Sequence, residues 1–169
     1  MFRDYVRLMV FAVGLLAGVQ LPGFVDQYAK RVDAHYQEAK LNFAGFQQTA
    51  DRHFGGDVEA MIQHHLKSGD VVFQEDGDSI RKIWLRVQLL GKELQAVQRP
   101  FLQRSFHVLF AANEELMAET RLNYTYVVPL NQEAVLAGVV LGFLIALLVE
   151  LLIVGLARLF RGTPAPARR

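Results

Sequence analysis

Three side chains in the first half of the chain have the types and spacing that could bind a metal ion. His53, Asp57 and His64 offer two imidazoles and a carboxylate, which is a ligand set that zinc accepts. His65 follows His64 directly, but adjacent positions of a helix point about 100° apart, so only one of the two readily joins a shared site. Surface and helix-capping roles are the more ordinary interpretation. We therefore expect no metal and no other cofactor, with these three residues as weak metal candidates.

An acidic run at Glu75-Asp76-Gly77-Asp78 also resembles a metal loop at first sight. It lacks the twelve-residue spacing and the final glutamate of a calcium loop, so the pattern favours a turn followed by a helix cap. The sequence contains no nucleophile elbow, phosphate-binding glycine loop or dinucleotide fingerprint. We therefore expect no catalytic residues and a protein that is not an enzyme.

Glu150 is the most costly side chain in the sequence, because it interrupts a long apolar run. A carboxylate in hydrocarbon needs a partner or a proton. Arg7 lies beside a second apolar run and shares one helical face with Phe11, Gly14 and Gly18. An antiparallel pair of helices would bring the two charges together, so we predict an intramembrane ion pair between Arg7 and Glu150. A proton relay, or a carboxylate that extends toward the aqueous phase, are the alternatives.

Two long apolar runs, at 8–25 and 134–157, must position Arg7 and Glu150. They are 18 and 24 residues long. At 1.5 Å per residue they would reach about 27 and 36 Å as helices, enough to cross a hydrocarbon layer of roughly 30 Å. The sequence predicts two transmembrane helices. The first run could instead be a cleaved signal peptide, but a poor cleavage motif at 17–20 and the continuing apolar sequence favour a retained anchor.

Small residues recur at steps of four on both predicted spans. Gly14 and Gly18 form such a pair in the first span, and Gly138, Gly142 and Ala146 form a ladder in the second. Small residues at this spacing allow helix backbones to approach closely. We expect these faces to pack against protein, either within one chain or between chains.

The arginines that flank the two spans predict the orientation of the chain. Arg3 and Arg7 lie at the first span, and four arginines follow the second, whereas the residues between the spans carry 12 basic and 15 acidic side chains. Positively charged flanks resist translocation. We expect both termini to be cytoplasmic and the central region to be periplasmic in a bacterium. The basic tail at 158–169 is expected to touch anionic lipid rather than nucleic acid.

The central region shows the spacing of helices and no convincing alternation of a strand. A long amphipathic helix is expected to continue from the first span to about His53, with shorter helices at 58–66, 78–98 and 101–111 and a last one that Asn113 caps. Seven aromatic residues are expected to form the core: Phe43, Phe46, Phe54, Trp84, Phe101, Phe106 and Phe110.

The predicted architecture is thus an all-α membrane protein in which two transmembrane helices flank a helical periplasmic domain. Its expected parts are a first transmembrane helix at 1–25, a periplasmic domain at 26–133, a second transmembrane helix at 134–157 and a basic cytoplasmic tail at 158–169.

Four short strings carry a resemblance to a known family: MFRDY at 1–5, GVQLPGFVDQY at 18–28, GFQQTAD at 45–51 and FGGD at 54–57. They resemble a proteobacterial family of small two-span membrane proteins of unknown function. The resemblance covers nearly the whole chain and implies an inner-membrane location in a Gram-negative bacterium. It supplies no catalytic residues and no activity.

These features favour a non-enzymatic accessory or scaffold subunit of a bacterial inner-membrane complex. Its expected partners are membrane lipid and either a membrane protein or further copies of this chain, and not nucleic acid. A periplasmic sensor or ligand-binding module is one alternative. A lipid-binding transport helper is another, which a continuous apolar groove between the long helix and the helix at 78–98 would favour.

Overall fold

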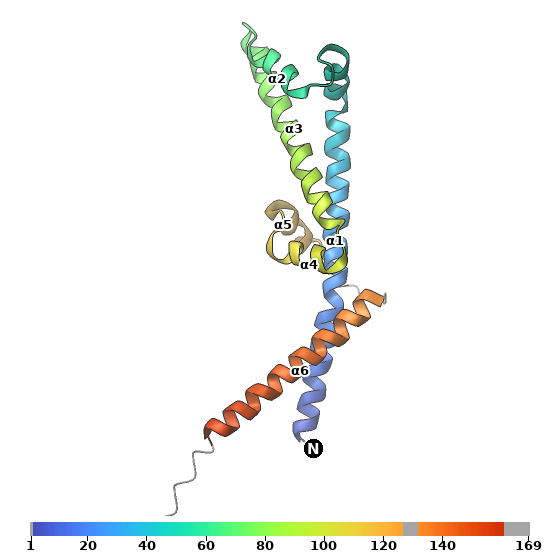
Figure 1. Ribbon diagram of the computed structural model, residues 1–169, viewed down its shortest axis with the longest axis vertical. Helices are drawn as coiled ribbons and strands as arrows, with labels where there is room; N and C mark the ends of the chain where they lie inside the picture. The colour runs from blue at the N-terminus through green and yellow to red at the C-terminus, as the bar shows by residue number, and fades with distance from the viewer. Residues whose placement is uncertain (1, 127–131, 161–169) are drawn as a thin grey trace, which may run out of the picture. The chain divides into compact units, whose positions relative to one another are not determined.

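The computed structural model describes the backbone of residues 2–126 and 132–160 and the side chains of residues 5–126 and 132–155. All regular elements in these residues are helices, which confirms the predicted all-α class for this part of the chain (Figure 1). The helices are α1 (Phe2–His53), α2 (Val58–Leu66), α3 (Val71–Val97), α4 (Phe101–Phe110), α5 (Glu114–Leu122) and α6 (Gln132–Phe160).

The chain divides into two compact units. The apolar unit consists of Met1–Phe24 and Thr125–Arg169, and the polar unit consists of Val25–Tyr124. Within the described part of the chain, two helices are long and apolar enough to cross a membrane, over Tyr5–His53 and Gln132–Gly155. Each of these helices includes one of the two predicted transmembrane segments.

The part of α1 within the polar unit is amphipathic, as the sequence predicts. Its predicted apolar stripe is buried or half-buried throughout: Val25, Tyr28, Val32, Tyr36, Ala39, Phe43, Phe46 and Ala50. The helix is continuous from Phe2 to His53 and includes Pro22, so the predicted extension of the first apolar segment as one helix is confirmed.

Two glycines end α1 and turn the chain into α2. Gly55 and Gly56 have φ angles of +60° and +87°, a left-handed conformation that L side chains disfavour. Asp57 then caps α2, and its Oδ1 accepts a hydrogen bond of 2.9 Å from the backbone N–H of Ala60. A hydrophobic core joins α1, α2 and α3 at this end of the polar unit, with Phe43, Ala50, Val58, Met61, Ile62 and Ile80 buried and Phe46, Phe54 and Trp84 packed against them.

The helix α3 begins earlier than the sequence suggests. The prediction of a turn at residues 75–78 and a helix start at Asp78 or Ser79 is wrong, because α3 starts at Val71 and Asp70 is its cap. Gly77 is a packing residue instead. A Cβ atom added there would lie 3.0 Å from the Cβ of His65 and the Cγ of Leu66, so its missing side chain lets α3 approach α2 closely.

From α2, α3 runs back beside α1 (Figure 1), and Gly91 of α3 meets the ring of Tyr36. The apolar residues of α3 at helical spacing form a stripe in which Ile80, Leu90 and Val97 are buried. The other positions of the stripe, Ile83, Trp84, Val87 and Leu94, are half-buried.

Two short helices, α4 and α5, complete the polar unit. The helix α4 starts at the predicted residue and ends at Phe110, one residue earlier than predicted. Asn113 caps α5 as predicted, and its side-chain oxygen accepts a hydrogen bond of 3.2 Å from the N–H of Leu116. The expected burial of Phe106 and Phe110 is wrong. Their exposed fractions are 66% and 72%, because α4 turns Ser105 and Val108 inward. The residues buried at this end of the unit are mainly aliphatic, with one tyrosine and one threonine: Tyr28, Val32, Leu90, Val97, Val108, Leu116 and Thr120.

Candidate functional site

Within the apolar unit, α1 and α6 pack through the small residues that the sequence singles out. A Cβ atom on Gly14 would lie 3.0 Å from the Cα of Gly142, and Gly18 faces the backbone of Gly138 in the same way. All four glycines are buried. Such close backbone approach gains van der Waals contacts that aliphatic side chains would prevent.

An aromatic pair extends this contact along the two helices. The rings of Phe11 and Phe143 meet edge to face, with centroids 5.3 Å apart and planes at 66°. A Cβ atom on Gly142 would lie 3.0 Å from the ring of Phe11, so this glycine makes room for it. The edge-to-face arrangement is a favoured geometry for two aromatic rings.

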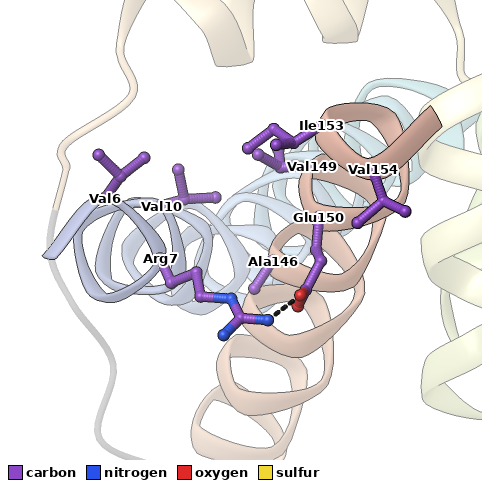
Figure 2. Close-up of a pocket in the computed structure, with 8 residues that line it drawn as sticks. All are labelled: Val6, Arg7, Val10, Ala146, Val149, Glu150, Ile153 and Val154. Atoms are coloured by element: carbon purple, nitrogen blue, oxygen red, sulfur yellow. Dashed lines mark ion pairs between the residues drawn. The ribbon is translucent and has the colours of Figure 1, made fainter. Parts of the chain in front are cut away.

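Arg7 and Glu150 form an ion pair between α1 and α6, with the guanidinium directed at the carboxylate (Figure 2). The pair joins the arginine that directly precedes the first apolar segment to the carboxylate that interrupts the second. Their side chains remain 40% and 33% exposed, respectively. Because an unpaired charge in hydrocarbon is costly, the pair lowers the free energy of placing either residue in an apolar environment.

Hollows flank the ion pair on the surface of the apolar unit. A small pocket of about 20 Å³ is lined by Arg7, Glu150 and Ala146 together with aliphatic side chains of α1 and α6: Val6, Val10, Val149, Ile153 and Val154 (Figure 2). A wider and more open groove of about 500 Å³ is lined by Arg7, Leu8, Phe11, Phe143, Ala146, Leu147 and Glu150. The same two charges are therefore accessible from a mostly apolar groove.

The weak metal candidates are not brought together. His53 is exposed at the end of α1, Asp57 accepts the capping hydrogen bond of α2, and the ring of His64 lies 5.6 Å from that of Phe54. Residues 5–126 and 132–155 contain no group of three histidine, cysteine, aspartate or glutamate side chains that could hold a metal ion.

A polar cluster in the polar unit escaped the sequence analysis. The hydroxyl of Tyr28 donates a hydrogen bond of 2.5 Å to Oε1 of Glu93 and accepts one of 2.9 Å from the N–H of Asn113. Nε2 of His107 lies 2.7 Å from the same carboxylate oxygen. Burial, and then the hydrogen bond to Glu93, raise the pKa of Tyr28 well above its ordinary value. The sequence did contain one sign of this cluster, because Glu93 lies between Leu90 and Val97 on the buried stripe of α3, where a carboxylate needs a partner.

Two further ion clusters tie α5 to the long helices. Glu119 is paired with Arg31 and lies 2.8 Å from Nε2 of His35. Partial burial opposes ionisation of Glu119, but the hydrogen bonds from His35 and Arg31 outweigh it and hold the pKa of Glu119 below its ordinary value. Arg86 of α3 contacts both carboxylate oxygens of Glu115 at 2.9 and 3.1 Å, and this pairing lowers the pKa of Glu115.

The described residues thus contain two kinds of polar arrangement. In the polar unit the charges join helices that are distant in sequence, which is a structural task. In the apolar unit one ion pair lies beside an open groove, where a further polar group could reach it. The Arg7–Glu150 groove, defined by the seven residues of the wider hollow, is therefore the candidate functional site.

The sequence profile of one protein family, described as "Protein of unknown function (DUF2937)", matches residues 2–162. No curated protein and no solved structure matches the chain. The family match covers almost the entire chain, including both helices that are apolar enough to cross a membrane. The chain therefore belongs to the DUF2937 family, a family of proteins of unknown function.

Proposed function

We propose that the protein is a non-enzymatic accessory or scaffold subunit of a bacterial inner-membrane complex, and that the Arg7–Glu150 groove receives a membrane helix of its partner. The observation that carries the proposal is an ion pair that lies between two apolar helices and stays partly open to an apolar groove. Hydrogen bonds and close packing drive helix association in lipid, where apolar contact alone gives no advantage over lipid tails.

The chemistry of the groove defines what it would accept. Phe11, Phe143 and Leu147 form an apolar wall. The guanidinium of Arg7 has further N–H groups that can donate, and the carboxylate of Glu150 has further lone pairs that can accept. A partner helix with small residues and one polar side chain at the matching depth would satisfy both features. Both a second copy of this chain and a different membrane protein fit this description, and the experiment below separates these cases.

The proposed topology places α1 and α6 across the inner membrane, with both termini cytoplasmic and the polar unit in the periplasm. The arginines at the two ends of the chain and the net negative charge of the residues between the apolar segments support this orientation. Arg7 is one of these arginines, so it contributes to orientation as well as to the groove.

The lipid-transport alternative gains no support from the polar unit. The hollow between α1 and α3 is lined by His35, Glu38, Ala39, Asn42, Ile83 and Arg86, most of which are polar or charged. A carrier for acyl chains needs a continuous apolar groove, and the side chains of His35, Glu38, Asn42 and Arg86 interrupt this one.

The test compares two identical substitutions. Leu147 lines the groove and Leu152 does not, yet their exposed fractions are 57% and 56%. The Leu147→Ala and Leu152→Ala variants and Glu150→Gln are expressed at native level, purified in mild detergent and examined by quantitative mass spectrometry. We expect one stoichiometric partner, or a stable homo-oligomer, in the wild type and in Leu152→Ala, and its loss in Leu147→Ala and Glu150→Gln.

Three outcomes contradict the proposal. One is a wild-type protein that purifies as a monomer without a recurring partner. Another is a partner that both leucine variants and Glu150→Gln retain equally. The last is a partner that Leu147→Ala and Leu152→Ala lose to the same degree, because the groove would then have no special part in the association.

A further inference from the structure

The helix α4 carries an apolar face that no described residue covers. Leu102, Phe106, Leu109 and Phe110 have exposed fractions of 79%, 66%, 53% and 72%. They follow one another at the i, i+4, i+7 and i+8 positions of one helical face, and the rings of Phe106 and Phe110 lie 4.7 Å apart. The sequence of α4 contains no acidic residue. A contiguous apolar face of this kind indicates a surface that contacts something other than water.

The contacts of α4 place it at a defined end of the polar unit. His107 of α4 meets Glu93, the residue that also binds the hydroxyl of Tyr28, and Asn113, just after α4, donates to that same hydroxyl. Tyr28 is only four residues beyond Phe24, which corresponds to about 6 Å of helical rise. At this end α1 enters the polar unit, and the helix α4 is tied to its first turns.

The chain also leaves the polar unit close to α5, the helix that follows α4. Arg31 and His35, on the next turns of α1, hold Glu119 of α5, and the polar unit ends at Tyr124, two residues after α5. Beyond it, the exposed fraction of Tyr126 is 82%. Both connections to the apolar unit therefore lie within a few residues of the segments that α4 and α5 contact.

We propose that α4 is an interfacial helix, and that its Leu102, Phe106, Leu109 and Phe110 face lies in the boundary between lipid headgroups and acyl chains of the bilayer that α1 and α6 cross. The inference rests on the proposed membrane location. The occupant is a lipid surface, because the two points where the chain leaves the polar unit for the apolar segments lie within a few residues of the segments that α4 and α5 contact. Aromatic and aliphatic side chains on one face of a short helix suit that boundary.

The chain contains no cysteine, so a single introduced cysteine can report on one position. The full-length Phe106→Cys and Val72→Cys variants are labelled with a polarity-sensitive fluorophore and reconstituted in phosphatidylcholine vesicles that contain lipids with a nitroxide near the headgroup. Val72 is a matched control, because its exposed fraction is 64% and it lies in the first turn of α3, at the other end of the polar unit. A third variant, Leu144→Cys, reports on the apolar unit through nitroxides deep in the acyl chains. Leu144 is 56% exposed on α6 and does not line the Arg7–Glu150 groove.

We expect a blue-shifted emission and strong quenching by the shallow nitroxide for the label at position 106, and neither for the label at position 72. Quenching of the label at position 144 by the deep nitroxide is the sign that the apolar unit is inserted. With the apolar unit inserted, a label at 106 that is unquenched and fully hydrated overturns the proposal, and so does one that is shielded from water but not quenched, which would indicate a protein partner. Equal quenching at 72 and 106 also contradicts it. If the label at 144 is not quenched, the membrane location itself fails and the interfacial role fails with it.

Discussion

Gly18 of α1 and Gly138 of α6 meet backbone to backbone, so that a Cβ atom added to Gly18 would lie 2.7 Å from the Cα of Gly138 and 2.8 Å from the carbonyl oxygen of Ala137. Neither neighbour is the end of a flexible side chain, so a methyl group at this position can be accommodated only if the two helices move apart. The close packing of the apolar unit therefore depends on the absence of a side chain at Gly18.

We predict that Gly18→Ala destabilises the apolar unit by about 1–3 kcal/mol, the usual range for overpacking. Gly155→Ala is the matched control on α6, because a Cβ atom there would meet nothing within 4 Å. The detergent-solubilised protein is heated, and the measurement is the temperature at which the area of its native gel-filtration peak falls to half. A Gly18→Ala protein as heat-resistant as Gly155→Ala would show that the helices do not pack through this face.

The hydroxyl of Tyr28 leads to a second prediction. In Tyr28→Phe, Glu93 loses a hydrogen-bond donor and the N–H of Asn113 loses its shorter acceptor, at a cost of about 1–3 kcal/mol for buried groups. Tyr36→Phe on the same helix is the control, since the Tyr36 hydroxyl makes no hydrogen bond with the residues that the structure describes. Thermal unfolding followed by circular dichroism should show a lower midpoint for Tyr28→Phe than for Tyr36→Phe. Equal midpoints would mean that the cluster contributes little to stability.

The pKa of Glu119 gives a pH dependence with a definite sign. Because the folded protein lowers this pKa below the ordinary value of 4.5, ionised Glu119 stabilises the fold at pH values above 4.5. That contribution is lost as the pH falls below 4.5 and through the lowered folded-state pKa. The Glu119 side chain is 39% exposed, so solvent screening keeps the effect small.

We expect Glu119→Gln to be less stable than the wild type at neutral pH, and we expect the difference to shrink as the pH falls below 4.5. Glu75→Gln is the control, because Glu75 is exposed and forms no ion pair within the described part of the chain. Unfolding midpoints across this pH range provide the measurement. A stability difference for Glu119→Gln that is independent of pH would contradict the assigned ion pairs.

Helix limits and the buried stripes of α1 and α3 could be predicted from the sequence, because both follow from local patterns. Apolar residues at steps of three and four define the stripes, and Asp57, Asn113 and the Gly55-Gly56 pair define helix ends. The start of α3 could not be predicted in this way. Gly77 looks like a turn residue locally, and only its contact with His65 and Leu66 explains a glycine inside a helix.

The same distinction applies to the candidate site. The ion pair between Arg7 and Glu150 could be predicted from the sequence. A charge in an apolar helix has few possible partners, and helical spacing determines which face of the helix it lies on. The contact of Glu93 with Tyr28 and His107 depends on where α4 packs, and the exposure of Phe106 and Phe110 depends on which side of α4 faces α3. Neither is a property of a single helix, so neither could be predicted from periodicity.

In the proposed topology the apolar helices cross the membrane in opposite directions and the polar unit lies in the periplasm. The most direct test is the modification of single cysteines by a membrane-impermeant maleimide, before and after lysis, in cells with a permeabilised outer membrane. We predict that Gln48→Cys, an exposed position on α1 in the polar unit, reacts in intact cells, and that Asp4→Cys reacts only after lysis. Reaction of Asp4→Cys in intact cells, or protection of Gln48→Cys until lysis, would contradict the account.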